Sequence, residues 1–223
     1  MKIHFDHIEG FGKVSDLDFI YSAPYGVLEP GESGADALKE GWIPWGSDWY
    51  NVRSVRLEVA QYRPTETVRK LSRKVRTQPG DLTLNQADYM QLYEQYCNYH
   101  DFARDIQWEF FEGCSCIEYW HDDKLVGVSF YKIYEDQFLA MQFIWNYEHP
   151  KLSLGNIAQM HECELAAALG CTHVYLLGGY EKCCRYKAGF KGFEFWTGLE
   201  WSSDIELYYV LVDRDEQIQV TLL

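Results

Sequence analysis

The chain has 223 residues, of which 47% are hydrophobic and 17% aromatic, so it can bury the core of one large domain or of two small ones. It contains no run of about 18 apolar residues and no N-terminal signal pattern, which predicts a cytoplasmic protein without a membrane-spanning helix. A formal net charge of −14 argues against a uniformly positive surface that binds nucleic acid indiscriminately.

The first half of the chain predicts two helices, a strand and an aromatic loop. A short helix is expected over residues 34–40, followed by an indole-rich loop over 42–50. Residues 54–62 alternate between apolar and polar side chains and therefore predict a strand. Pro64 then stands where a second helix can begin.

The second half predicts a helix, a meander of strands and a mixed α/β unit. Leu92, Tyr96 and Tyr99 lie at helical spacing, so a helix is expected over 84–100. Apolar runs separated by acidic turns predict three antiparallel strands, at 116–120, 125–134 and 137–145. After them we expect, in chain order, a helix at 154–169 with Leu154, Ala158, Leu165 and Leu169 along one side, a buried strand at 173–177, and further strand at Trp201 and 206–213.

The order meander, helix, strand, helix, strand resembles the Gcn5-related N-acetyltransferase fold, an α/β (α+β) arrangement in which helices flank a mixed sheet. The resemblance implies that the acyl donor binds where parallel strands splay, at the N-terminus of the helix between them. We divide the chain into an N-terminal lobe at 1–80 and an acyltransferase domain at 81–223. The lobe would then be an N-terminal extension of the fold.

Ser153 and Gly155 are candidate substrate-binding residues at the start of the helix predicted at 154–169. Ser153 is a good N-cap, and Gly155 lets a ligand approach the backbone closely. Members of the fold that use acetyl-CoA carry a Q/R-x-x-G-x-G/A loop here, whose amides hold the pyrophosphate. The chain lacks that loop, which argues against acetyl-CoA as the donor. The alternative is a plain helix start.

Basic residues concentrate over residues 53–76, which hold eight of the 20 in the chain. Four of them share one face of the predicted helix, with Val68, Leu71 and Val75 facing inward. Such a face, with Arg63 beside it, fits the backbone phosphates of tRNA, and the alternative is a solvated surface. We call these four residues the basic stripe: Arg69, Lys70, Arg73 and Lys74.

Other candidate substrate-binding residues precede the basic stripe. Trp42 and Trp45 belong to an aromatic cluster that is expected to stack the terminal bases of a tRNA or to frame a substrate pocket. The alternative is that the cluster packs in the core. Arg53 or Arg56 is expected to bind an acceptor carboxylate through two hydrogen bonds. The seven cysteines include no C-x-x-C pair and the seven histidines no ligand spacing, so the sequence predicts no metal and no cofactor.

Short motifs carry a second and more specific resemblance. In chain order these are Val55-Arg56, Tyr62-Arg63-Pro64, Ser153-Leu154-Gly155, Glu164-Leu165-Ala166, Leu177-Gly178-Gly179-Tyr180 and Tyr186-Lys187. Together they resemble the C-terminal domain of the aminoacyl-tRNA–protein transferases, the arginyl- and leucyl-transferases of the N-degron system. The chain departs from the family in two ways. The N-terminal cysteine cluster is absent, and the Y-D-P-D segment is replaced by residues 145–148, in which only Glu148 is a carboxylate.

The resemblance implies transfer of an amino acid from aminoacyl-tRNA to an amino group of a protein N-terminus or of a smaller molecule. An aminoacyl ester is already activated, so the enzyme must orient the amine, keep it neutral and stabilise the oxyanion. Glu148 is then expected to orient or deprotonate the amine, and Tyr186 and Lys187 to contact the terminal adenosine or the leaving oxygen. The alternatives are a solvated acid, and a core tyrosine beside a surface lysine.

Two other functions stay open at this point. One is an N-acyltransferase of the same fold that uses an acyl thioester on a small amine. The other is a non-catalytic domain that binds RNA or an acidic partner. The missing pyrophosphate loop argues against the first, and an assay with charged tRNA separates the second from an aminoacyltransferase.

Overall fold

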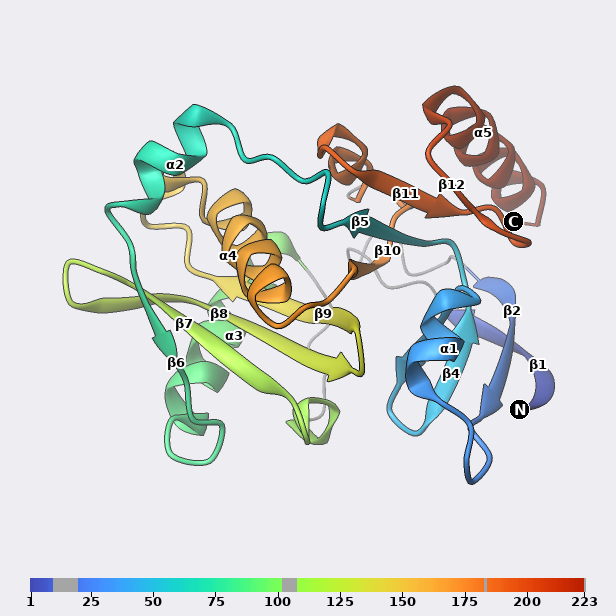
Figure 1. Ribbon diagram of the computed structural model, residues 1–223, viewed down its shortest axis with the longest axis horizontal. Helices are drawn as coiled ribbons and strands as arrows, with labels where there is room; N and C mark the ends of the chain where they lie inside the picture. Colours follow the sequence, from blue (N-terminus) through green and yellow to red (C-terminus); the bar gives the residue numbers. More distant parts are fainter. Residues whose placement is uncertain (10–19, 102–107, 183, 223) are drawn as a thin grey trace.

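The computed structural model describes residues 1–9, 20–101, 108–182 and 184–222 (Figure 1). Its largest element is a sheet whose strands run from one edge to the other as β12 (Trp201–Ser202), β11 (Phe193–Trp196), β5 (Ser54–Glu58), β10 (His173–Gly178), β9 (Gln137–Trp145), β8 (Lys124–Tyr134), β7 (Ser115–His121) and β6 (Arg76–Pro79). Strands β9 and β10 are parallel, and the other neighbours are antiparallel. The predicted meander is present as β7, β8 and β9.

Two helices cover opposite faces of this sheet (Figure 1). On one face α3 (Gln86–His100) contributes Tyr89 and Leu92 to a core cluster. On the other face α4 (Leu154–Ala168) contributes Met160 and Cys163 to a second cluster. Neighbouring side chains of the sheet divide between the two clusters, as alternation along a strand requires. Both helices were expected from the sequence.

A second, smaller sheet lies beside α1 (Gly34–Lys39), in the order β1 (Lys2–Glu9), β2 (Ile20–Val27), β4 (Asp48–Asn51) and β3 (Trp42–Trp45). The prediction of a loop over 42–50 is wrong. Strands β3 and β4 form a hairpin whose two-residue turn contains Gly46 at φ +63°. The strands have four residues each, which is too short for an alternating pattern to stand out among so many aromatic residues.

The segment at 206–213 is helical, so the strand expected there is wrong. Helix α5 (Ile205–Leu222) buries Tyr208 and Val212, which are four residues apart, and exposes Val210 between them. A short apolar run fits both a helix and a strand, and only the packing partner decides. The Tyr208 hydroxyl donates a hydrogen bond of 2.5 Å to the carbonyl oxygen of Gly179, which ties α5 to the end of β10.

The large sheet takes strands from both predicted domains. Strands β5 and β6 precede residue 80, yet they lie in the same sheet as β7 to β12. The helix between them, α2 (Glu66–Ser72), packs on α4. The division at residue 80 stays a prediction. Among the described residues, no helix combines the length and the apolar character needed to cross a membrane.

Strands β9 and β10 separate toward their C-terminal ends. Their parallel pairing covers only residues 173–175 against 137–139. Beyond it β10 is irregular, because Leu177 has φ +59° and the register with β5 shifts between Tyr175 and Gly178. Since α4 leads into β10 through a short turn, its N-terminus lies at this same end of the sheet. We call this region the divergent end.

Candidate functional site

Lys187 lies at the divergent end, in the short helix η4 (Arg185–Gly189). Its Nζ donates hydrogen bonds to the carbonyl oxygens of Leu176 at 2.8 Å and of Gly178 at 2.6 Å. Both carbonyls belong to the part of β10 that has left β9. The structure therefore places this predicted catalytic residue where the strands separate, with its ammonium group fixed by backbone oxygens.

A buried carboxylate on α4 was not among the sequence-based candidates. Glu162 is 4% exposed and accepts a hydrogen bond from the hydroxyl of Ser129 on β8. Burial raises the pKa of Glu162 to about 7, while the Ser129 hydrogen bond and the Lys187 ammonium oppose that rise. Glu162 and Lys187 are thus electrostatically linked at the divergent end.

The sequence held a signal for Glu162. The prediction placed Leu165 and Leu169 along one side of the helix with Leu154 and Ala158, but Leu169 is exposed while Leu154 and Ala158 are buried. One fully buried row with four-residue spacing is made up of Leu154, Ala158, Glu162 and Ala166. One carboxylate in an otherwise apolar row is a recognisable pattern, because a buried charge needs a reason to be there.

Aromatic side chains gather where β9 ends. Tyr99 of α3 stacks on Tyr147, with ring centroids 3.5 Å apart and planes 4° apart. A ring nitrogen of His100 shares a hydrogen bond with the Tyr147 hydroxyl, and the Trp145 ring lies beside both. Tyr99 is 63% exposed, so the stack is open to solvent. We call these four residues, Tyr99, His100, Trp145 and Tyr147, the aromatic platform.

The other two predicted catalytic residues lie beside the aromatic platform. Glu148 follows Tyr147 directly and is exposed. Tyr186 is 66% exposed and packs edge-on against Phe190. Burial is the main cause of the raised pKa of Tyr147, and Tyr186 contributes to it, so the two phenols are close. Glu148, Tyr186 and Lys187 therefore gather at the divergent end, and their chemical roles stay predictions.

Ser153 and Gly155 lie at the start of α4. Ser153 occupies the N-cap position of α4, as expected, but it has φ +57° and its side chain makes no capping hydrogen bond. Its hydroxyl instead accepts a hydrogen bond from Asn156 at 3.4 Å. No heavy atom lies within 4 Å of where a Cβ would stand on Gly155. The first turn of α4 is therefore open at Gly155.

Both arginines proposed for an acceptor carboxylate are paired inside the chain. Arg53 donates from Nε to Asp215 at 2.7 Å. Arg56, 9% exposed, donates to Glu194 at 2.6 Å, and its guanidinium lies 4.3 Å from the Trp201 ring centre. The two predicted tryptophans differ in their burial. Trp42 packs in the core cluster of α3, which favours the core alternative, and Trp45 is half-buried.

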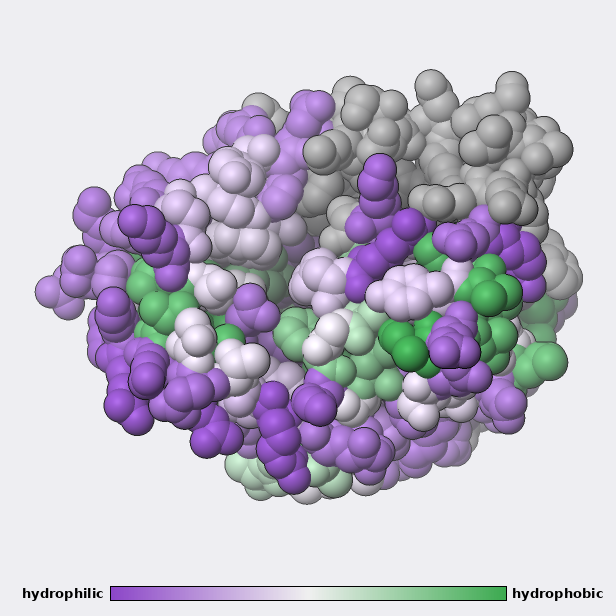
Figure 2. Space-filling model, turned by 90° about the horizontal axis from the view of Figure 1, so that it is seen from above, coloured by the Kyte–Doolittle hydropathy of each residue, from purple (hydrophilic) through white to green (hydrophobic). Residues whose placement is uncertain are grey.

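The basic stripe lies at the same end of the molecule as the start of α4. All four of its residues and Arg63 are exposed, and hydrophilic side chains cover the surface around α2 (Figure 2). Val68 and Leu71 face α4, as expected. Helix α2 ends at Ser72, so the stripe continues past the helix. The carbonyl of Lys74 contacts His121, whose ring lies 4.9 Å from that of His149, just before α4.

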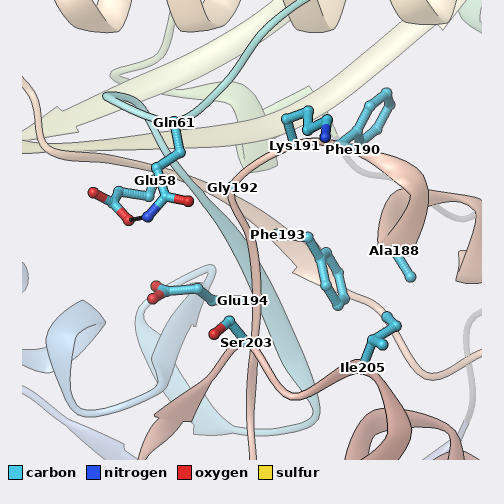
Figure 3. Close-up of a pocket in the computed structure, with 10 residues that line it drawn as sticks. All are labelled: Glu58, Gln61, Ala188, Phe190, Lys191, Gly192, Phe193, Glu194, Ser203 and Ile205. Atoms are coloured by element: carbon cyan, nitrogen blue, oxygen red, sulfur yellow. Dashed lines mark hydrogen bonds between the residues drawn. The ribbon is translucent and has the colours of Figure 1, made fainter.

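A pocket of about 280 Å³ lies at the opposite end of β10, where Glu58 pairs with His173. On one side Glu58, Gln61 and Glu194 lie close together, and Phe193 and Ile205 lie on the other (Figure 3). Ala188, the residue after Lys187 in η4, also lines the pocket, although the Lys187 ammonium group binds at the far end of β10. None of the sequence-predicted site residues lines it.

Solved structures share the fold of the chain. It is similar to FemX at 10% identity over 70% of this chain and 62% of that chain, with a TM-score of 0.50. It is also similar to the C-terminal domain of a putative lysylphosphatidylglycerol synthetase from Agrobacterium fabrum, at 9% identity over 57% of this chain and 46% of that chain, with a TM-score of 0.49. A third similar structure is a Gcn5-related N-acetyltransferase from Kribbella flavida, at 16% identity over 57% of this chain and 49% of that chain, with a TM-score of 0.40. The chain spans about half the length of the latter two. The mixed sheet and the FemX match confirm the predicted fold class.

No curated protein sequence matches the chain. The family model described as arginine-tRNA-protein transferase, C terminus, matches residues 78–197, which are 120 of the 223 residues. The matched span contains the aromatic platform, Glu148, Glu162 and Lys187, and it confirms the resemblance that the sequence motifs indicate. The chain therefore belongs to the family of the arginine-tRNA-protein transferase C-terminal domain.

Proposed function

We propose that the chain is an aminoacyltransferase that moves an amino acid from aminoacyl-tRNA to an amino group. The family match carries this proposal, because it covers the whole divergent end from the aromatic platform to Lys187. The absent pyrophosphate loop supports an ester donor over a coenzyme A thioester. We take arginine as the first donor amino acid to test, leucine as the second, and the cytoplasm as the place of reaction.

The chemistry needs no covalent intermediate. The amine nitrogen attacks the ester carbonyl carbon, the bond from that carbon to the ribose oxygen breaks, and the ribose oxygen takes up a proton. Before the attack, the ammonium group loses one proton to a base and becomes a neutral amine; the second proton that the nitrogen loses is the one that the ribose oxygen takes up. Lys187, fixed by two carbonyls, is suited to stabilise negative charge on the oxyanion or on the leaving ribose oxygen. In this proposal Glu148 orients or deprotonates the amine, and Tyr186 contacts the terminal adenosine or the leaving oxygen.

The basic stripe is suited to the donor. It lies beside the start of α4, so a tRNA whose phosphates contact Arg69 and Arg73 can direct its acceptor end toward the divergent end. The aromatic platform offers the exposed ring of Tyr99 for stacking with the terminal adenine. In this arrangement the acceptor is the N-terminus of a protein or a smaller amine.

Mass spectrometry of acceptor peptides tests the proposal. Peptides that begin with Asp or Glu are incubated with the protein and a mixture of charged tRNAs, and N-acetylated peptides serve as controls. The expected result is a mass increase of one amino acid residue on the free-amine peptides alone. If no tRNA-dependent product forms while calorimetry shows micromolar affinity for acetyl-CoA, the thioester function replaces this one.

A further inference from the structure

Glu181 and Lys187 lie on either side of Gly178, at the end of β10. After β10 the chain turns, and the amide of Cys184 donates a 2.7 Å hydrogen bond to the Glu181 carbonyl before η4 begins. A Cβ on Gly178 would stand 2.8 Å from Oε1 and 2.9 Å from Oε2 of Glu181. The carboxylate therefore lies against the backbone of Gly178, whose carbonyl oxygen binds the Lys187 ammonium.

One oxygen of this carboxylate is buried and unpaired. Oε2 of Glu181 has no hydrogen-bond partner in the part of the chain that the structure describes. An unpaired buried carboxylate oxygen costs free energy, because it has lost its bonds to water and gained none. Neither of two nearby arginines forms an ion pair with Glu181 among the described residues, and Arg185 donates from Nε to the carbonyl of Tyr180 at 3.2 Å. The Arg53 guanidinium lies 5.7 Å from the Tyr180 ring centre, but its Nε binds Asp215.

Two other buried carboxylates of the protein, Glu162 on α4 and Glu118 on β7, do have hydrogen-bond donors. Glu162 accepts a hydrogen bond from Ser129. Glu118 on β7 is buried as well, and its oxygens accept hydrogen bonds from the side chains of Gln78, Asn85, Tyr89 and Trp120. The chain thus supplies side-chain donors to both of these buried carboxylates. Oε2 of Glu181 has no such donor among the described residues, which leaves it able to accept a hydrogen bond from another molecule.

We propose that Glu181 binds a primary ammonium group of a substrate at the divergent end. An ammonium group is a strong donor of the opposite charge, and it fits beside a carboxylate that a second cation, Lys187, does not neutralise directly. The inference rests on the proposed function, in which two ammonium groups meet at this end. One is the α-ammonium of the donor amino acid, and the other is that of the acceptor. Both present the same chemistry to Glu181.

Binding experiments test this without requiring transfer. Leucine methyl ester stands for the donor, since it has an ester and no second cation, and a peptide beginning with Asp stands for the acceptor. Each is compared by calorimetry with its N-acetylated form. The wild-type protein should prefer at least one free amine by roughly tenfold to a hundredfold, the range of a charge-assisted hydrogen bond. Glu181→Gln should lose that preference, and Glu164→Gln, an exposed acid on α4, should keep it.

The outcomes separate the possibilities. A preference that Glu181→Gln abolishes for the ester assigns the donor ammonium, and one abolished for the peptide assigns the acceptor. Equal preference in wild type and Glu181→Gln, or none in wild type, overturns the inference. A melting temperature of Glu181→Gln well below that of wild type would also overturn it, because an unpaired oxygen has no internal bond to lose. If transfer fails but the preference holds, only the proposed function is lost.

Discussion

The ammonium group of Lys187 lies 2.6 Å from the carbonyl oxygen of Gly178, nine residues earlier in the chain. Together with the bond to Leu176, this contact holds the lysine at the point where β10 leaves β9. A charge that is fixed before the reaction begins needs no reorganisation when negative charge develops beside it. The irregular end of β10 therefore serves to place one cation.

Replacing Lys187 by Met should lower kcat roughly a hundredfold or more, while the KM for charged tRNA changes little. The reason is that the ammonium acts on charge present only in the transition state. Single-turnover transfer measures the effect, and Lys182→Met, an exposed neighbour, is the control. A folded Lys187→Met variant with wild-type kcat would reduce the lysine to a structural tie across β10.

Long periodic patterns in the sequence predicted much of this end of the fold. Helices α3 and α4 and the three strands of the meander repeat their apolar spacing often enough to be recognised. The hairpin of β3 and β4 and the helix α5 were missed, because four-residue strands and a short apolar run fit more than one period. Whether such a segment forms a strand or a helix depends on what packs against it, and that is a tertiary property.

The candidate site likewise contains residues that the sequence indicates and residues that only the folded structure reveals. Lys187 and Tyr186 were found through motifs, and Glu148 through its place beside a family segment. Glu181 carries no local signal, because its distinguishing feature is the lack of a partner in the folded chain. Arg56 shows the converse, since a residue suited to bind a substrate carboxylate is already paired with Glu194.

Glu162→Gln should change the pH dependence of stability. Burial raises the pKa of Glu162 from 4.5 to about 7 in the folded protein, so the folded state binds more protons than the unfolded state between these values. The wild-type free energy of unfolding therefore loses about 3 kcal/mol from this group as pH rises from 4.5 past 7. The variant lacks that loss. In urea denaturation, the free energy of unfolding of the variant relative to that of wild type should therefore rise by up to that amount between pH 4.5 and pH 8.

Glu118→Gln is the matched comparison for Glu162→Gln, and its sign is opposite. Burial alone would raise the pKa of Glu118, but its four side-chain hydrogen bonds, led by that from Tyr89, bring it below 4.5. A lowered folded pKa gives stability that is present above 4.5 and is lost as pH falls through the folded value. The variant should cost about 1–3 kcal/mol at neutral pH and less in acid. Identical pH profiles for the two variants would contradict both assignments.

Tyr99→Ala should weaken the binding of charged tRNA without unfolding the protein. Stacking of a base on an aromatic side chain is worth about 1–3 kcal/mol, which corresponds to a loss of roughly 5- to 150-fold in affinity. Tyr99→Phe keeps the ring and should bind like wild type. Filter binding with charged tRNA measures the difference. If both variants bind as wild type does, the aromatic platform does not contact the terminal adenine.

The basic stripe predicts a change in salt dependence. Arg69 and Arg73 are the better pair to replace, because Lys70 lies 3.9 Å from Glu66 and is already partly neutralised. If both arginines contact tRNA phosphates, the double change to Gln removes about two phosphate contacts and flattens the log–log salt slope by roughly 1.4 to 1.8. Thermal stability should change by less than about 0.5 kcal/mol per site, since both side chains are exposed.

Changing Lys2 and Lys191 to Gln removes the same charge away from the stripe and should leave the slope nearly intact. Equal slopes for the two double variants would mean that α2 presents only a solvated face, and that the tRNA must approach the divergent end from another side.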